Sequence, residues 1–289
     1  MAHRPVRPVS GGTLCVIGGA EDRTGPRVVL REFVQLAGGP GTRVAVVATA
    51  SSLGPEILDE YDAVFRELGA SDVVRLRPES RDQADDPAVA SALGDVDAVF
   101  LTGGNQLKLA GVVAGTAFGE SIVAAHRRGA VVGGTSAGAS AMSEHMIAFG
   151  DDTDSPRQGT TGSAAGLGLL PGVVIDQHFD QRNRYARLLS LVARSPRLLG
   201  IGVDEDTAAV VRGGREIEVI GAGSVFVADG SRAVSDAHLA EAGAPLLVSG
   251  VVVHALPAGA RFDLADRRLV SFVESHLAHE LREQVEEDE

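Results

Sequence analysis

Residues 131–142, V-V-G-G-T-S-A-G-A-S-A-M, decide the fold. The stretch begins with β-branched apolar residues, passes through two glycines and continues into small helix-forming residues, so it predicts a strand, a tight turn and a helix. The turn matches G-x-S-x-G, the pattern of a nucleophile elbow, in which Gly134 and Gly138 avoid a Cβ clash at the sharp chain reversal. Such a turn raises the Ser136 hydroxyl above the sheet edge and leaves the N–H of Ala137 facing a developing oxyanion. A glycine-rich packing corner has the same pattern, so a catalytic assignment also needs a base and an acid.

Strands and helices alternate strictly up to this turn. Apolar strands are predicted at residues 13–17, 43–49, 72–76 and 98–102, with helical patterns at 26–36, 55–68, 89–93 and 106–128, the last broken near Gly115. This order predicts an α/β fold with a doubly wound, mostly parallel sheet and helices on both faces. Ligands of such sheets bind beyond the carboxyl ends of the strands. The turns at 18–19 and 103–104 and Ser136 all follow strands, so we expect them to meet.

The pattern changes after the elbow. Residues 150–170 are rich in Asp, Ser, Thr and Gly and predict a long loop, whose D-D-T-D run lacks the spacing of an EF-hand and is typical of a solvated acidic loop. Strands are predicted at 173–175 and 199–203, antiparallel hairpin strands at 207–212, 216–220 and 224–228, a strand at 248–256 and a C-terminal helix at 267–284. No linker or repeat divides the chain. We therefore expect a flexible arm at 1–11, a single α/β domain at 12–284 and an acidic tail at 285–289.

Composition excludes several functional classes. The 289 residues are 44% apolar with 36 glycines and no tryptophan, which suits a parallel sheet buried on both faces by small aliphatic side chains. The net charge of −13 argues against a non-specific nucleic-acid binder. A single cysteine, Cys15, no signal-peptide pattern and no membrane-length apolar run predict a cytoplasmic protein. Because G-x-G-x-x-G and metal-ligand spacings are absent, no cofactor and no metal are expected.

A base and an acid follow the next two strands. Of the eight histidines, His178 is the one that ends a strand in the alternating part of the chain, at the ligand-binding edge. Residues 204–206, D-E-D, end the following strand, and alternation turns Glu205 away from Asp204 and Asp206. The pattern alone does not decide whether the histidine is oriented by Glu205 or by one of the two aspartates on the opposite side of the strand. The Ser, acid, His order of α/β-hydrolases would instead require His238 or His254 as the base.

Four motifs together resemble the cyanophycinase family: G-G-T-S-A-G-A, D-Q-H-F-x-x-R-x-R-x-x-R-L, G-x-G-x-D-E-D-T-A and T-G-G-N-Q, within roughly residues 12–275. The resemblance implies a serine-type exopeptidase related to aspartyl dipeptidase (peptidase E), with a fold like that of class I glutamine amidotransferases. It also implies the substrate cyanophycin, a poly-aspartate with an arginine on each side-chain carboxylate, and β-Asp-Arg dipeptides as the product of an acyl-enzyme. One position departs from the family pattern, since Asn105 stands where T-G-G-D-Q has an aspartate.

The resemblance also assigns site residues. Ser136 corresponds to the nucleophile, His178 to the base and Glu205 to the acid. The substrate-pocket positions of the family fall on Gln106, Asp176, Gln177, Arg182, Arg184 and Arg187. For the oxyanion hole we expect the N–H groups of Ala137 and of Gly104, which lie at adjacent strand ends.

The three arginines of the motif are also compatible with a solvated helix face. In a regular helix, Arg184 and Arg187 share a face from which Arg182 points away, so all three could not reach one ligand.

Four other functions compete with this one. An esterase of the α/β-hydrolase type is disfavoured by the order of the serine, the histidine and the acid in the chain. A glutamine amidotransferase is excluded because it needs a cysteine at the elbow, whereas Cys15 lies in the first strand. A related serine dipeptidase acting on Asp-containing peptides and a non-catalytic binding protein of the same fold stay open. A homodimer is expected, as the family resemblance also suggests, because the late apolar strands and the terminal helix offer the side chains of Leu269, Val270, Phe272, Val273, Leu277 and Leu281.

Overall fold

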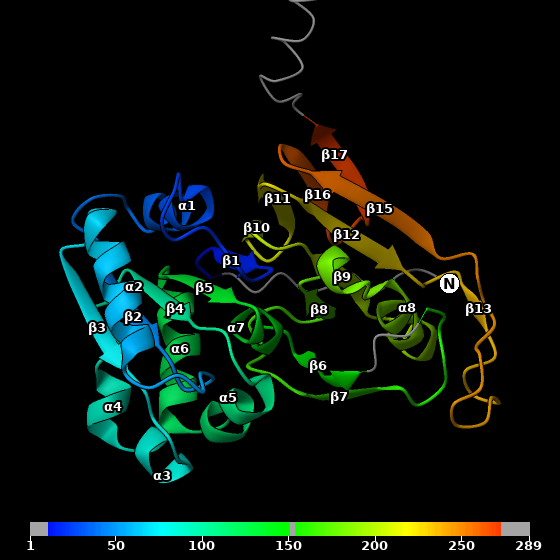
Figure 1. The fold of residues 1–289 in the computed structure, drawn as a ribbon, viewed down its shortest axis with the longest axis horizontal. Coiled ribbons are helices and arrows are strands. Elements are labelled where there is room, and N and C mark those ends of the chain that lie inside the picture. Colours follow the sequence, from blue (N-terminus) through cyan, green and yellow to red (C-terminus); the bar gives the residue numbers. More distant parts are fainter. Residues whose placement is uncertain (1–10, 151–153, 273–289) are drawn as a thin grey trace, which may run out of the picture.

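The computed structural model describes residues 11–150 and 154–272. Its main feature is a nine-stranded sheet with the order β17-β16-β11-β10-β1-β5-β4-β2-β3 (Figure 1). The strands at one end of this order run parallel: β1 (Leu14–Ile17), β5 (Val131–Thr135), β4 (Ala98–Leu101), β2 (Arg43–Val47) and β3 (Asp72–Leu76). The others pair antiparallel and extend the sheet beyond β1: β10 (Thr207–Arg212), β11 (Glu216–Gly221), β16 (Ala260–Asp263) and β17 (Arg268–Phe272).

Helices cover both faces of the parallel strands. One face packs against α1 (Val28–Leu36) and α2 (Glu56–Glu67), and the other against α5 (Gln106–Val113), α6 (Ala117–Arg128) and α7 (Ala137–Ala141). Because strand residues alternate between faces, Phe100 joins the first core with Phe33 and Phe65, whereas Leu101 joins the second. Two short helices, α3 (Arg81–Ala84) and α4 (Pro87–Ser91), lie between β3 and β4 in the chain. The predicted α/β fold with helices on both faces of a parallel sheet is confirmed.

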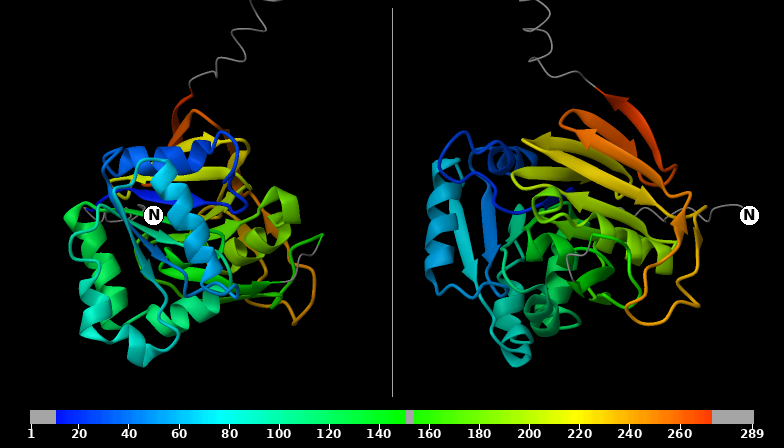
Figure 2. Two further views of the ribbon diagram at one scale, coloured as in Figure 1. Left: turned by 60° about the vertical axis from the view of Figure 1, so that its left-hand side comes forward. Right: turned by 45° about the vertical axis from the view of Figure 1, so that its right-hand side comes forward.

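A separate four-stranded sheet carries the residues after the elbow. Its order is β15-β12-β9-β8, with the bounds β8 (Val173–Gln177), β9 (Leu199–Val203), β12 (Ser224–Asp229) and β15 (Val252–Pro257). A short 3-10 turn (Asp180–Arg182) leads into α8 (Tyr185–Arg194), which packs Leu188 and Val192 against this sheet. The doubly wound pattern therefore stops at β5, because β10 already occupies the other side of β1 and leaves no place there for β8. In the right-hand view of Figure 2, the late strands, yellow to red, lie on the opposite side of the molecule from α2–α4.

The prediction of one long loop at residues 150–170, which is based on composition, is wrong. The strand β7 (Thr161–Ala165) lies inside this segment and pairs antiparallel with β6 (His145–Gly150), which comes before it. The sequence of β7, T-G-S-A-A, has no alternating apolar residues, so its pairing comes from the backbone and leaves no local signal. Asp151 and Asp152 of the D-D-T-D run lie outside the described residues.

Three more predictions in the last third of the chain need correction. The expected hairpin series ends at β10 and β11, because β12 crosses to the second sheet and pairs with β9 and β15. The strand predicted at 248–256 is split near Gly250 into β14 (Val248–Ser249), paired with β13 (Val234–Ser235), and β15. Residues 268–272 form β17, not the start of a helix, because β16 pairs with them, and the rest of the predicted helix lies outside the described residues.

The membrane criterion gives a limited result. In the described ranges no single helix is long and apolar enough to cross a membrane; α5 and α6 meet that criterion only as a pair, with a bend of 97° between them.

Candidate active site

The elbow holds Ser136 in an unusual backbone conformation. Its φ and ψ are 51° and −110°, between the end of β5 and the start of α7. A Cβ on Gly134 would lie 2.6 Å from the carbonyl carbon of Gly138, and a Cβ on Gly138 would lie 2.2 Å from the carbonyl oxygen of Leu101. The first glycine is therefore needed by the turn itself, as predicted, whereas the second is needed by the neighbouring strand β4.

His178 lies directly opposite the serine hydroxyl. Its Nε2 is 2.9 Å from Ser136 Oγ, and its Nδ1 is 2.6 Å from Glu205 Oε1. Parallel pairing of β8 and β9 sets Gln177 beside Val203, so the two strands release His178 and the 204–206 turn at the same edge. With the proton on Nδ1, the imidazole donates to Glu205 and accepts from the serine hydroxyl. The structure thus arranges the three side chains in one hydrogen-bonded line.

The glycine turn after β1 makes room for this imidazole. The carbonyl of Gly18 accepts from the N–H of His178 at 2.8 Å, and a Cβ on Gly19 would lie 2.3 Å from the imidazole ring. Only a glycine lets the backbone come this close to the ring. The turn at 18–19 therefore lies at the site, as expected for the carboxyl end of a parallel strand.

Of the three neighbouring carboxylates, only that of Glu205 reaches His178. The Asp204 carboxylate accepts from the N–H and the hydroxyl of Ser224, both at 2.9 Å. One oxygen of Asp206 accepts from the N–H of Asp22 at 2.9 Å. The N–H of Glu205 donates to the side-chain oxygen of Gln181 at 2.9 Å, which fixes the backbone behind the carboxylate. The two aspartates therefore hold loops in place around the third acid.

Burial governs the protonation of the imidazole. It lowers the pKa of His178 below the usual 6.5, while the hydrogen bond to Glu205 opposes this shift and the nearby charge of Arg182 adds to it. The ring is therefore mainly neutral at pH 7. A neutral imidazole beside the hydroxyl is the form that accepts a proton.

The turn after β4 lies against the elbow. A Cβ built on Gly103 would lie 3.4 Å from the Cβ of Ser136 and 4.0 Å from its Oγ. The next residue, Gly104, has a φ of 138°, and a Cβ there would lie 2.1 Å from the carbonyl oxygen of Ala50. In the part of the chain that the structure describes, the N–H of Gly104 donates to no protein acceptor. The backbone next to the serine thus offers the kind of N–H group that an oxyanion needs.

Arg184 and Arg187 lie inside the protein, around a buried carboxylate. Asp176 has no solvent exposure, and Arg187 binds both of its oxygens, with Nε 2.7 Å from Oδ2. A guanidinium nitrogen of Arg184 lies 3.3 Å from Asp176 Oδ1 and also donates to the backbone and side-chain oxygens of Gln177. Arg182, in the 3-10 turn, is exposed. A solvated helix face therefore describes neither Arg184 nor Arg187, and the three arginines fall into two groups.

Two further predicted residues lie at the start of α5. Gln106 donates from its side chain to the carbonyl oxygen of Ile147 on β6 at 3.1 Å. Asn105 caps the helix by accepting from the N–H of Lys108 at 3.0 Å, a role in which asparagine and aspartate are nearly equivalent.

A cavity of about 250 Å³ opens beside Ser136. Three residues that the sequence analysis did not select line it: Glu21, Arg23 and Tyr61. The carboxylate of Glu21 accepts from the hydroxyl of Tyr61 and from that of Thr135, each at 2.5 Å. Its position in the sequence could have indicated Glu21, because this residue follows the glycine turn at the carboxyl end of β1. Among the described residues, no group of three or more His, Cys, Asp or Glu side chains could hold a metal ion.

Comparison with known proteins gives one family match and several close relatives. The model of peptidase family S51 matches residues 14–219. A cyanophycinase of Geminocystis herdmanii is 41% identical over 254 residues, which cover 87% of this chain and 93% of that protein. Cyanophycinases of Trichormus variabilis and Synechococcus elongatus are 40% and 35% identical, covering 89% and 88% of this chain and 87% and 79% of those proteins.

Solved structures share the fold at lower identity. A peptidase from an acI-B1 Actinobacterium superposes with a TM-score of 0.63 at 21% identity, covering 88% of this chain and 97% of that one. A putative peptidase E of Listeria monocytogenes gives a TM-score of 0.52 at 18% identity, covering 74% of this chain and all of that one. At these identities the likeness concerns the fold alone.

Proposed function

Because the chain belongs to peptidase family S51, we propose that it is a serine-type exopeptidase that hydrolyses cyanophycin to β-Asp-Arg dipeptides. The relatives that are 35–41% identical over most of this chain are cyanophycinases, which supports this substrate. The observation that carries the proposal is the line of hydrogen bonds from Ser136 Oγ to His178 Nε2, 2.9 Å, and from His178 Nδ1 to Glu205 Oε1, 2.6 Å.

The proposed mechanism proceeds through an acyl-enzyme. His178 takes the hydroxyl proton as Ser136 Oγ attacks the scissile carbonyl, and Glu205 stabilises the imidazolium that forms. The N–H groups of Ala137 and Gly104 would bind the oxyanion. The imidazolium then protonates the leaving amine, and a water activated by the same imidazole hydrolyses the ester. The serine proton therefore leaves on the amine, and one proton of the water restores the serine hydroxyl, so that the enzyme returns to its starting state.

The substrate-binding residues divide by burial. Arg182, exposed and close to His178, is our candidate for binding a substrate carboxylate. Asp176, Arg184 and Arg187 would shape the wall of the site, since their charges are paired inside the protein. Gln177 would do so as well, since it accepts hydrogen bonds from Arg184. Gln106 would contribute through the β6 backbone to which it is bonded.

We also infer a relationship of the fold to class I glutamine amidotransferases and a cytoplasmic location. The alternation of strands and helices up to the elbow supports the first. The second rests on the cysteine content, because a single cysteine, Cys15, allows no intrachain disulfide.

One assay tests the proposal. The purified protein is incubated with cyanophycin, with β-Asp-Arg dipeptide and longer β-Asp-Arg oligomers, and with a p-nitrophenyl ester. Release of dipeptide from the polymer is expected, and Ser136→Ala should abolish it with an unchanged circular dichroism spectrum, since alanine fits the same turn. Cleavage of short Asp-containing peptides alone would indicate a related dipeptidase, and binding without cleavage a non-catalytic protein. Undiminished turnover in Ser136→Ala would remove this serine from the mechanism.

A further inference from the structure

Within the described part of the chain, Glu21 is a buried carboxylate without a cationic partner. Its residue is 5% exposed, and both hydrogen bonds to its oxygens come from neutral hydroxyls, those of Tyr61 and Thr135. Across residues 11–150 and 154–272, no Arg, Lys or His side chain forms an ion pair with it. Burying a charge without a counter-charge is costly, so such a group is typical of a site whose counter-charge arrives with a ligand.

Both hydroxyls act as donors to the carboxylate of Glu21. Burial and the charge of Glu21 raise the pKa of Tyr61 well above its usual value, so its hydroxyl remains a neutral donor. Tyr61 comes from α2, and Thr135 directly precedes Ser136 at the end of β5. Each carboxylate oxygen accepts one hydrogen bond from these side chains and keeps a lone pair for another donor. The carboxylate is thus held between two rigid elements with acceptor capacity to spare.

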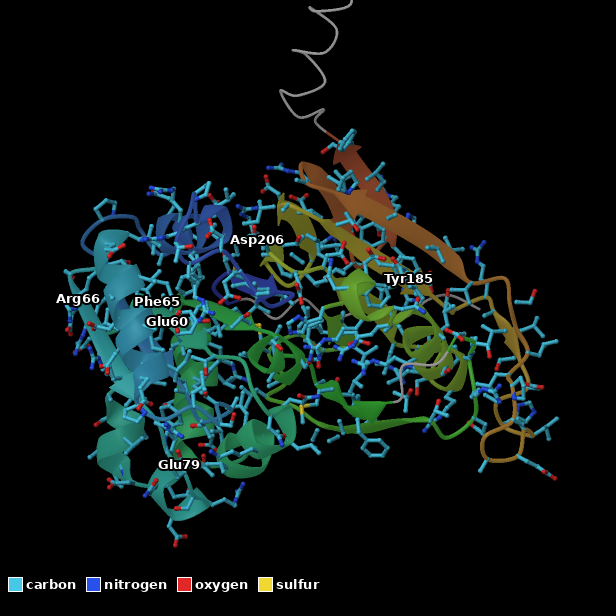
Figure 3. The ribbon with its side chains drawn as sticks, viewed as in Figure 1. Glu60, Phe65, Arg66, Glu79, Tyr185 and Asp206 are labelled. Carbon is cyan, nitrogen blue, oxygen red and sulfur yellow. The ribbon has the colours of Figure 1, made fainter. Side chains whose placement is uncertain are left out.

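The cavity next to Ser136 carries opposite charges at two points. Glu21 and Arg23 both line it, and the Arg23 guanidinium lies 5.7 Å from the centre of the Tyr61 ring. Arg23 is partly exposed and also pairs at 3.1 Å with Glu60 of α2. Figure 3 labels Glu60 on this helix. An occupant of this cavity would therefore meet a carboxylate where the wall is buried and a guanidinium where it is open. A volume of about 250 Å³ suits one side chain.

We propose that this cavity binds one arginine unit of the substrate, with its guanidinium on Glu21 and its free α-carboxylate towards Arg23. The inference rests on the proposed function. In cyanophycin each arginine is joined through its α-amine to an aspartate side chain, so it retains both a guanidinium and an α-carboxylate. A planar guanidinium donates two parallel hydrogen bonds to one carboxylate, which matches the two unfilled acceptor positions. Glu21 would therefore determine which substrate side chain is accepted in the cavity next to Ser136.

The test compares charged and neutral substrates of the same shape. Kinetics are measured for wild type and Glu21→Gln with β-Asp-Arg oligomers and with oligomers in which citrulline replaces arginine. We expect the variant to lose kcat/KM for the arginine substrate by about 10- to 100-fold, the usual size for a hydrogen bond to a charged group, mainly through KM. For the citrulline substrate it should change less than about threefold, since glutamine keeps an acceptor and the shape.

A matched control removes a carboxylate elsewhere. Glu67→Gln takes an exposed acid from α2, where it pairs with Arg27, and should leave the preference for arginine unchanged. Arg23→Gln should raise KM for oligomers with free arginine carboxylates and have little effect on their amidated forms.

The possible negative results separate the cation site from the proposed function. Equal losses on both substrates would mean that Glu21 acts only through Thr135 on the elbow, and equal rates for arginine and citrulline in wild type would also overturn the inference. Absence of cyanophycin hydrolysis by wild type would instead contradict the proposed function. If Glu21→Gln does not fold, calorimetric titration of Ser136→Ala with the arginine and citrulline dipeptides decides: tighter binding of arginine by 10-fold or more is expected, and equal binding refutes the cation site.

Discussion

Strain at single residues aims the reactive side chains at each other. Ser136 and His178 both have positive φ, 51° and 46°, in a region that non-glycine residues seldom adopt. Such conformations cost about 1–3 kcal/mol each and persist only where the surroundings hold them. Here the glycines at 18–19 and 134 supply the space, so the elements around the site provide the stability that the site itself lacks.

The carboxylate of Glu205 should matter through its charge. Glu205→Gln preserves the side-chain shape but cannot stabilise the imidazolium, so we predict a loss in kcat of about 10²–10⁴. Steady-state kinetics on cyanophycin measure it. Asp206→Asn is the control, because Asp206 bonds the N–H of Asp22 and not the imidazole. If Asp206→Asn abolished activity while Glu205→Gln kept a nearly wild-type kcat, the acid would be Asp206 and not Glu205.

The acid limb of the pH profile should lie below pH 6.5. Catalysis needs the neutral imidazole, and burial lowers the pKa of His178, so protonation inactivates the free enzyme only at lower pH. The two neighbours act in opposite directions: Glu205 raises this pKa and Arg182 lowers it. In plots of kcat/KM against pH, the limb should therefore move down in Glu205→Gln and up in Arg182→Gln. Shifts of the same sign in both variants would contradict this account.

At the scale of elements, an ion cluster joins β8 to α8. Asp176 is the last but one residue of β8, and Arg184 and Arg187 reach it from the start of α8. Asp176→Ala would leave two buried cations without that carboxylate, so we predict a loss of about 3–5 kcal/mol in the free energy of unfolding. Urea denaturation measures it. Asp59→Ala, which breaks an exposed pair with Arg75, should lower the free energy of unfolding by less than about 1 kcal/mol. Equal losses in the two variants would show that the buried cluster stabilises the fold no more than an exposed ion pair does.

The sequence predicts elements better than it predicts their partners. Long β-branched runs such as residues 43–47 mark buried strands, and the glycines around Ser136 mark the elbow. Local pattern misses β7, because T-G-S-A-A carries no alternation, and it assigns 268–272 to a helix because these residues alone do not reveal that β16 pairs with them. The crossing of β12 to the second sheet is likewise a long-range choice that its own residues do not encode.

At the scale of the whole molecule, the site forms where two sheets meet. Ser136 comes from the nine-stranded sheet, whereas His178 and Glu205 follow strands of the four-stranded one. The sequence predicts the strand ends and, with the family resemblance, the three residues. It could not reveal Glu21, because its partners Tyr61 and Thr135 are 40 and 114 positions away and only the packing of α2 and β5 brings them together.

The last strand offers a surface for assembly. β17 is the edge of the nine-stranded sheet, and Leu269, Val270 and Phe272 on it are 44–48% exposed. An apolar edge strand with unpaired backbone groups is a template for pairing with a second chain. Val252 and Val253, also about half exposed, add apolar surface on β15. We predict a homodimer that uses this side of the molecule.

Light scattering at micromolar concentration should give twice the chain mass of 29.8 kDa. Phe272→Glu places a charge on the edge strand and should shift the population towards monomer, because a buried unpaired carboxylate opposes association. Val28→Glu on α1, an equally exposed apolar position on another part of the surface, is the control and should leave the dimer intact. A monomer mass for wild type would contradict the prediction, and dissociation by Val28→Glu alone would place the interface on α1 instead of the late strands.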